Sequence, residues 1–442
     1  MLPTREQLRD QLGRAIERHE SMGYDMAGLT DRLDKARVSY DELVAVGLEA
    51  MERPRREDWA YVEPEDIEGI RAECDPQRCT GPLDGADAVD QSERVRAGFL
   101  SSVCGCVLGK PVEVQPSLAE LRDALSATGD WPLDDYIPMA ALEKLGRHHP
   151  QSLGCTRERL CAVVPDDDLN YSILGMLVLE EHGRGFTREH VADCWRRMLP
   201  VGWTFGPERK TLAQIAVSDC CWPRDSHPLV RFLLVGDTYC GAQIRADAYG
   251  YAAAGRPELA ADLAWRDAGL NHVGTGLYAT LWTAAAIATA CVVRDPVEVF
   301  RTATRYIPQR SRFAEAIRKC IELVEASADW LAGYERIHAA FGEYGHCRVL
   351  QESGTMINAV AFAENTGQAI CRQVMQGNDT DSYGATCGSL AGCLFGPDGL
   401  EDRWLAPLND TIYTTLAEFH EQRLSAVADR MAALPRRLAG GS

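Results

Sequence analysis

GNDTDSYGATCGSLAGCLFG, residues 377–396, is the stretch that decides the fold. Its glycines at Gly384, Gly388, Gly392 and Gly396 recur every fourth residue, so on a helix they form one stripe. Glycine weakens an isolated helix by ~1 kcal/mol per residue relative to alanine. Four glycines on one stripe therefore indicate tight packing against a second helix. The sequence predicts a rigid central helix that fixes the carboxylates at its start.

Acidic clusters stand before two apolar runs that are far apart in the sequence. One is the Asp379-Thr380-Asp381-Ser382 segment above, and the other is Asp166-Asp167-Asp168-Leu169-Asn170. Carboxylates repel one another and are costly to bury, so such clusters need a reason. A hard cation such as Mg²⁺, which prefers oxygen ligands, is one reason. A helix N-cap or a solvated helix face is the plainer alternative for the Asp run.

The chain shows helical spacing in many segments and no sustained alternation typical of strands. The sequence therefore predicts an all-α fold. The expected helices include 6–20, 40–51, 170–182, 189–199, 257–268, 277–293, 296–306, 311–331, 354–364 and 410–434. Residues 1–92 are predicted to form an N-terminal helical extension and connection, and residues 93–442 the main all-α domain, which the family resemblance described below implies is catalytic.

Composition excludes several classes of partner. The formal charge is −19, with 46 Lys+Arg against 65 Asp+Glu, which argues against nucleic acid as a partner. The uncharged stretch most worth testing as a membrane span, 277–293, is shorter than the ~20 residues that a span needs, so no membrane association is expected. The N-terminus lacks the apolar core of a signal peptide, and a cytoplasmic location is expected. The 16 cysteines include no CxxC pair, so they are predicted to be free buried thiols without zinc.

Several motifs, taken in order, resemble the ADP-ribosylglycohydrolase family. Arg94-Val95-Arg96-Ala97-Gly98, with Gly105 through Glu113, resembles its opening RxRGxxxGxxxGDxxGxPxE helix. Asp166-Asp167-Asp168 resembles its metal motif, Gly241-Ala242-Gln243-Ile244-Arg245 its ADP-ribose loop, and Asn271-His272 its Thr-His motif. Residues 377–396 are similar to GGDTDTxAAxxGxxxGxxxG, which is the most specific of these matches.

The resemblance implies a compact orthogonal bundle of α-helices around a binuclear Mg²⁺ centre, with Mn²⁺ as the alternative ion. It implies metal ligation by Asp166, Asp167, Asp168, Asp379, Asp381 and Ser382. It implies catalytic roles for Glu113 and Asp167. It implies substrate contacts by Gly241, Arg245, His272, Gly274, Gly276, Gly377 and Asn378, with the glycines admitting a pyrophosphate to the backbone.

The chain also departs from the family pattern. Cys106 stands where the opening motif has Asp, so one carboxylate is lost. Thr238-Tyr239-Cys240 replaces the Gly-Asn-Gly before the substrate loop, and Val273-Gly274 follows His272. Plainer interpretations also stay open: Glu113 as an exposed helix-end acid, His272 as a buried structural histidine, and Arg245 in an ion pair with Asp247.

The expected chemistry is hydrolysis of the glycosidic bond at the ribose anomeric carbon. Mg²⁺ would orient the ribose hydroxyls and polarise a water molecule, and Glu113 or a cluster Asp would accept a proton from that water. The expected substrate is ADP-ribosyl or nucleotide-like, with an ADP-ribosylated protein as a further candidate partner. A small NAD-derived metabolite is a second possibility, and a catalytically silent ADP-ribose-binding protein is a third.

Overall fold

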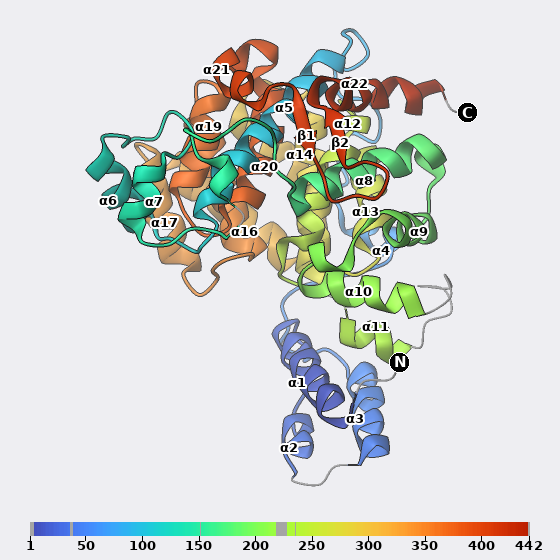
Figure 1. Ribbon diagram of the computed structural model, residues 1–442. Helices are drawn as coiled ribbons and strands as arrows, with labels where there is room; N and C mark the ends of the chain where they lie inside the picture. The colour runs from blue at the N-terminus through green and yellow to red at the C-terminus, as the bar shows by residue number, and fades with distance from the viewer. Residues whose placement is uncertain (1–3, 36–38, 151, 218–227, 235, 441–442) are drawn as a thin grey trace.

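The computed structural model describes residues 4–35, 39–150, 152–217, 228–234 and 236–440. Within these residues the fold is a helical bundle with one short hairpin (Figure 1), which confirms the all-α prediction. The N-terminal helices are α1 (Arg5–Ser21), α2 (Leu29–Leu33), α3 (Tyr40–Glu52) and α4 (Ile67–Glu73). The following helices are α5 (Ser92–Gly109), α6 (Leu118–Thr128), α7 (Met139–Leu145), α8 (Asp167–His182), α9 (Arg188–Met198), α10 (Gly206–Val217), α11 (Pro228–Leu234), α12 (Asp247–Ala252), α13 (Pro257–Ala268) and α14 (Gly274–Ala290). The remaining helices are α15 (Pro296–Thr304), α16 (Arg312–Glu325), α17 (Trp330–Phe341), α18 (Val349–Ala361), α19 (Thr366–Met375), α20 (Thr380–Phe395), α21 (Asp402–Leu405) and α22 (Leu424–Gly440).

Short 3₁₀ helices and a two-stranded hairpin connect these helices. The 3₁₀ helices are η1 (Lys110–Val112), η2 (Leu153–Cys155), η3 (Gly183–Gly185), η4 (Val201–Trp203), η5 (Cys240–Arg245), η6 (Pro397–Gly399) and η7 (Ala406–Leu408). The hairpin consists of β1 (Thr411–Tyr413) and β2 (Glu421–Arg423), which pair antiparallel with Ile412 opposite Gln422.

The closest helix packing joins α5 to α20, with the two helices antiparallel. A Cβ atom placed on Gly105 would lie 1.9 Å from the carbonyl oxygen of Gly384. One placed on Gly109 would lie 2.1 Å from the carbonyl oxygen of Thr380. Backbone meets backbone along this seam, and only glycine leaves room for that approach. The predicted glycine stripe is therefore a helix contact, and it sets the end of α5 against the start of α20.

The N-terminal helices α1–α3 form a lobe that projects from the main body (Figure 1). Their buried apolar residues, among them Leu12, Ile16 and Leu43, form a small core of their own, which also takes in Leu229 and Phe232 of α11. Residues 53–91 then run back along the body, where the backbone N–H of Leu83 donates to Gly255. The domain boundary at residue 92 stays a prediction.

The centre of the body is α14, which is buried along its whole length. This helix matches the predicted segment 277–293. No helix among the described residues is long and apolar enough to cross a membrane. Every cysteine within the described ranges is a free thiol, and most are buried.

Two predicted helices are wrong: 311–331 is interrupted at residues 326–329, between α16 and α17, and 410–434 is wrong at its start. Residues 411–413 and 421–423 form the hairpin, and the helix begins only at Leu424. Asn409 and Asp410 have positive φ angles of 48° and 50°, which do not continue a right-handed helix. The segment Thr411-Ile412-Tyr413 is β-branched and aromatic, and such residues favour a strand. Ile412 in β1 and Leu416 in the hairpin loop are both buried, so their apolar spacing reflects burial of the hairpin and does not indicate a helix.

Candidate active site

Three carboxylates from separate segments converge on the side chain of Lys110. The Nζ atom of Lys110 lies 2.8 Å from Oδ2 of Asp166, 2.9 Å from Oδ2 of Asp381 and 2.9 Å from Oε2 of Glu113. Lys110 begins η1, directly after α5, and only 5% of its surface is exposed. The α5–α20 seam brings these residues together. The two remote acidic clusters therefore meet in space.

The first cluster forms the start of α8. Asp166 is the N-cap, and its Oδ1 accepts a hydrogen bond of 2.9 Å from the backbone N–H of Asp168. Asp167 is part-buried, whereas Asp168 is only 4% exposed. Burial, together with the neighbouring Asp166, raises the pKa of both Asp167 and Asp168 above its usual range. The N-cap interpretation is thus correct for Asp166. It does not explain the carboxylates of Asp167 and Asp168, whose ionised forms burial disfavours.

Glu113 and Asp381 lie at the same centre, and their pKa values shift in opposite directions. Burial and the Asp381 carboxylate raise the pKa of Glu113 to about 10. Burial also acts against the ionised form of Asp381, but Lys110 and the hydrogen bond from Glu113 lower its pKa below the usual value. The same centre therefore raises the pKa of one carboxyl group, that of Glu113, and lowers the pKa of the other, that of Asp381. This environment, buried and coupled to other carboxylates, is not that of an exposed helix-end acid.

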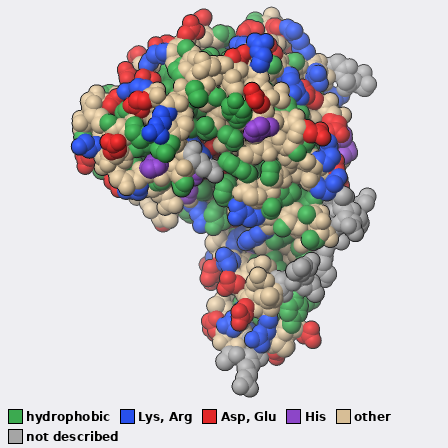
Figure 2. Space-filling model, viewed as in Figure 1, with side chains coloured by type: hydrophobic (Ala, Val, Ile, Leu, Met, Phe, Trp, Pro, Cys, Tyr) green, Lys and Arg blue, Asp and Glu red, His purple; other side chains and the backbone are tan. Residues whose placement is uncertain are grey.

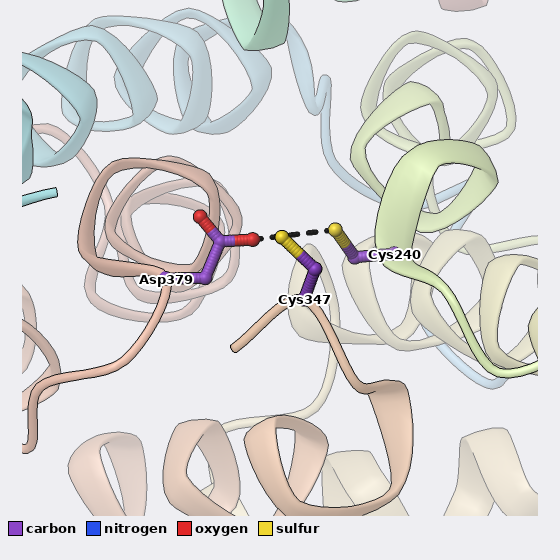
Figure 3. Close-up of side chains that lie close together, drawn as sticks. All are labelled: Cys240, Cys347 and Asp379. Carbon is purple, nitrogen blue, oxygen red and sulfur yellow. Dashed lines mark hydrogen bonds between the residues drawn. The ribbon is translucent and has the colours of Figure 1, made fainter. Parts of the chain in front are cut away.

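The second cluster begins α20 and meets two thiols. Cys240 donates a hydrogen bond of 3.3 Å to Oδ2 of Asp379, and the Cys347 side chain lies beside both groups (Figure 3). The backbone N–H of Asp379 donates to Glu352. Ser382 is buried at the first turn of α20, where its backbone N–H donates to Oδ1 of Asp381. Carboxylate, thiol and hydroxyl groups thus surround the start of this helix.

Potential metal ligands group at three places among the described residues. Each group offers ligand atoms that lie within 4.8 Å of one another: Glu113, His346 and Asp379; Cys106, Asp166 and Asp168; Cys240, Cys347 and Asp379. Within the same part of the chain, the buried Oδ1 atom of Asp168 has no hydrogen-bond partner. A buried carboxylate oxygen without a partner is the kind of atom that a cation would satisfy. The residues present therefore fit a divalent ion.

Arg245 lies in a buried ion-pair network. Its guanidinium donates to Oδ1 of Asp267, to Oε1 of Glu208 at 3.0 Å and to Oδ1 of Asn271 at 3.0 Å. It also donates to the carbonyl oxygen of Gly241 at 2.8 Å. Arg245 is 1% exposed, and these protein acceptors occupy its donors. The alternative of a structural ion pair is thus correct in kind, although the partners are Asp267 and Glu208 rather than Asp247. Substrate contact by Arg245 stays a prediction.

His272 belongs to the same network. It is fully buried, with Nδ1 2.9 Å from Oδ1 of Asn271 and 3.6 Å from Oε1 of Glu208. Burial, followed by the charge of Arg245, lowers the pKa of His272 well below its usual value, so the ring is neutral. The structure therefore places His272 with Arg245, in a cluster separate from the groups around Lys110.

The predicted substrate-binding glycines approach protein atoms. A Cβ atom on Gly241 would lie 2.5 Å from the Glu208 carboxylate, and one on Gly276 would lie 2.1 Å from the carbonyl oxygen of Asp237. Gly274 has a φ of +53° and faces the Asp237 carboxylate. These close contacts explain the glycines by packing. Their contact with a pyrophosphate stays a prediction.

The turn before α20 has left-handed backbone at two successive residues. Gly377 has a φ of +81°, and its Cβ position is filled by the carbonyl oxygen of Pro116. Asn378 has a φ of +64°, and its side-chain Nδ2 donates to Gln351 at 2.7 Å. This turn aims Asp379 and Asp381 at the end of α5. Asn378 thus positions the cluster, and its contact with substrate stays a prediction.

Comparison with known proteins decides the family. The ADP-ribosylglycohydrolase family model matches residues 87–438. The chain belongs to the ADP-ribosylglycohydrolase family. The fold agrees with a solved structure described as an ADP-ribosylglycohydrolase-related protein complex, at a TM-score of 0.51 and 19% identity, covering 79% of this chain and 99% of that one. Comparison with curated proteins found no match. The chain is therefore a glycohydrolase of the ADP-ribosyl type.

A basic cavity of about 600 Å³ lies between α1, α10 and the segment 236–239 of this ADP-ribosylglycohydrolase-family chain. Its cationic lining residues are Arg14 and Arg18 of α1, Lys210 of α10, and Arg348, and its acidic ones are Glu17 and Asp237. Burial and the charges of Arg14 and Arg18 lower the pKa of Lys210. Figure 2 shows Lys and Arg side chains gathered where the N-terminal lobe meets the body. Tyr239 lines this cavity, and the next residue, Cys240, contacts Asp379.

Several residues of this candidate site were not predicted from the sequence. They are Lys110, His346, Cys240, Cys347 and Glu352. Cys240 and Cys347 lie far apart in the chain, and the search for a CxxC pair does not detect thiols that the fold brings together. Lys110 lies within the opening motif, but nothing in a Gly-Lys-Pro sequence predicts that its ammonium turns into an acidic cluster.

Proposed function

We propose that this enzyme hydrolyses the glycosidic bond at the anomeric carbon of ribose in an ADP-ribosyl or related nucleotide substrate, with Mg²⁺ as its ion and Mn²⁺ as the alternative. The observation that carries the proposal is the meeting of Asp166, Asp381 and Glu113 at one buried point. Asp379 and the buried Asp168 adjoin that point. Family membership adds the reaction class, because these proteins are glycosyl hydrolases.

The acidic residues would hold the ion. Asp379, Asp381 and Ser382 at the start of α20, together with Asp166, Asp167 and Asp168 at the start of α8, supply the hard oxygen donors that Mg²⁺ prefers. When bound, the ion supplies Lewis-acid chemistry: it orients the ribose hydroxyls and lowers the pKa of a water molecule.

Glu113 is the proposed proton acceptor. It lies part-buried at the acidic centre, with 23% of its side chain exposed. Its raised pKa means that, once ionised, Glu113 is a stronger base than an ordinary carboxylate. The bond to the leaving group breaks with oxocarbenium character, and the buried Asp carboxylates stabilise that positive charge.

The basic cavity supports a substrate that carries phosphates. Arg14, Lys210 and Arg348 line it, and guanidinium and ammonium groups are the usual partners of phosphate oxygens. Tyr239 lines this cavity, and the next residue, Cys240, donates to Asp379. A nucleotide that reached from the cavity past these two residues would place its phosphates among the cations and its ribose beside the carboxylates.

The experiment is a release assay on a panel of substrates. The panel contains an ADP-ribosylated protein and free NAD-derived glycosides, each with and without Mg²⁺ or Mn²⁺. We expect turnover that falls by about 100-fold or more in Asp379→Ala, whereas the exposed Asp123→Ala control retains it. Release from protein alone eliminates the metabolite alternative. Tight ADP-ribose binding without turnover, unchanged in Asp379→Ala, supports the silent binding protein and refutes the enzyme.

A further inference from the structure

The acidic centre contains a positive charge of its own. Lys110 is only 5% exposed, and its Nζ atom lies within 2.9 Å of three carboxylates. These come from the start of α8, the start of α20 and the residue after η1. An ammonium donates at most three hydrogen bonds, and here three carboxylates stand ready to accept them. The side chain is thus held where the oxygen donors converge.

The position of this ammonium is the position that a hard cation would take. Mg²⁺ in proteins is bound by carboxylate oxygens, and Asp166 and Asp381 are the carboxylates that the two acidic motifs contribute. An ammonium and a divalent ion repel each other. They cannot share the Asp166 and Asp381 oxygens at close range without a large electrostatic cost.

The charge balance at the end of α5 points the same way. The Sγ atom of Cys106 and a carboxylate oxygen of each of Asp166 and Asp168 lie within 4.8 Å of one another, so an uncharged side chain faces both carboxylates. Its motif has a carboxylate at this position. A carboxylate lost at Cys106 and an ammonium gained at Lys110 together change the local charge by two, which is the charge of one divalent ion.

A second group of possible metal ligands lies beside the carboxylates that surround Lys110. Glu113, His346 and Asp379 offer ligand atoms within 4.8 Å of one another, and the Nδ1 atom of His346 is buried without a hydrogen-bond partner among the described residues. Glu113 belongs to both groups, so the two positions are adjacent. The geometry accommodates one fixed ammonium and one exchangeable ion.

We propose that the ammonium of Lys110 permanently replaces one divalent ion of a two-cation centre, so that each chain binds a single divalent ion, next to Asp379. This inference rests on the proposed ion-dependent function, and it alters the expected number of ions from two to one. Lys110 acts as a positioning residue, because it holds Asp166, Asp381 and Glu113 at the spacing that a second ion would otherwise impose.

The test counts ions on the full-length chain. Protein freed of ions with a chelator is titrated with Mn²⁺, and bound ions are counted by calorimetry and by electron paramagnetic resonance. We expect one ion per wild-type chain and two per Lys110→Ala chain, because that substitution removes the ammonium and opens space. Lys144→Ala, an exposed lysine on α7, is the matched control and should bind one ion.

Two results overturn the proposal. A wild-type chain that binds two ions, or none, refutes it without recourse to any variant, even if Lys110→Ala fails to fold. A folded Lys110→Ala chain that still binds one ion refutes it as well. Because ion counting does not depend on turnover, a failure here is distinguishable from a failure of the proposed function, which would show as an inactive substrate panel.

Discussion

The glycine seam between α5 and α20 allows a sharp test, the substitution Gly105→Ala. A Cβ atom at this position would lie 1.9 Å from the carbonyl oxygen of Gly384, whereas ordinary contact begins at 3.4 Å. The helices must therefore separate by 1.5 Å, the difference between those two distances. The atom that must move is main chain of a buried helix, so no side chain can rotate away. The separation would also draw Asp381 away from Lys110.

The magnitude follows from two opposing terms. Overpacking a well-packed core costs about 1–3 kcal/mol and occasionally more, and a clash with backbone belongs at the upper end. Alanine returns ~1 kcal/mol of helix propensity. We therefore expect Gly105→Ala to lower the free energy of unfolding by about 2 kcal/mol or more. Gly13→Ala in α1, with no atom within 4 Å of the new Cβ, should instead raise it by up to ~1 kcal/mol.

The assay is urea unfolding followed by circular dichroism, with substrate turnover measured on the same preparations. Gly105→Ala should lose both stability and turnover, and Gly13→Ala should lose neither. If Gly105→Ala unfolds within about 0.5 kcal/mol of the wild type, which is the ordinary range for an inconsequential surface change, the tight seam does not exist and the reasoning fails.

Three further predictions concern buried charges. Burial raises the pKa of Asp247 from 3.8 to about 7, so the free energy of unfolding falls as pH rises from about 4 to 7. Asp247→Asn should abolish this fall, which amounts to roughly 4 kcal/mol at most. If the free energies of unfolding of the two proteins change in parallel between pH 4 and pH 8, the prediction is wrong. Arg245→Met leaves Glu208 and Asp267 buried without their cation, so it should lower stability by about 3–5 kcal/mol; weaker substrate binding at an unchanged melting temperature would instead show a substrate contact. Glu113→Gln removes the proton acceptor but keeps its shape, so kcat should fall by about 100-fold or more while the melting temperature holds, and an unchanged kcat would exclude Glu113 as the base.

Periodicity in the sequence predicted the architecture well. The stripe of glycines beginning at Gly384 indicated a helix contact, and the apolar run at 277–293 indicated the buried helix α14. Both signals are local, because helix-forming residues and their spacing lie within one segment. The error at 410–434 arose where the same spacing served a hairpin, since burial of Ile412 and Leu416 does not specify the backbone that buries them.

Side-chain partners were harder to predict than helices. The sequence suggested Asp247 as the partner of Arg245, because the two residues are close in the chain. The fold instead pairs Arg245 with Asp267 and Glu208, which come from α13 and α10. Burial of an arginine selects whichever carboxylates the packing brings within reach, and that choice depends on tertiary structure.

The same reasoning explains why an acidic motif cannot by itself give the number of ions at a centre. The number depends on the sum of charges that surround the carboxylates in space. Lys110 stands 271 positions before Asp381, yet the α5–α20 seam brings its ammonium to 2.9 Å from that carboxylate. A motif shows only the anionic residues of one segment, whereas the affinity of a site for an ion depends on every charge within a few ångströms. The cation that decides the balance here lies far from Asp381 in the sequence but at the same end of the α5–α20 pair, so only the folded chain reveals it.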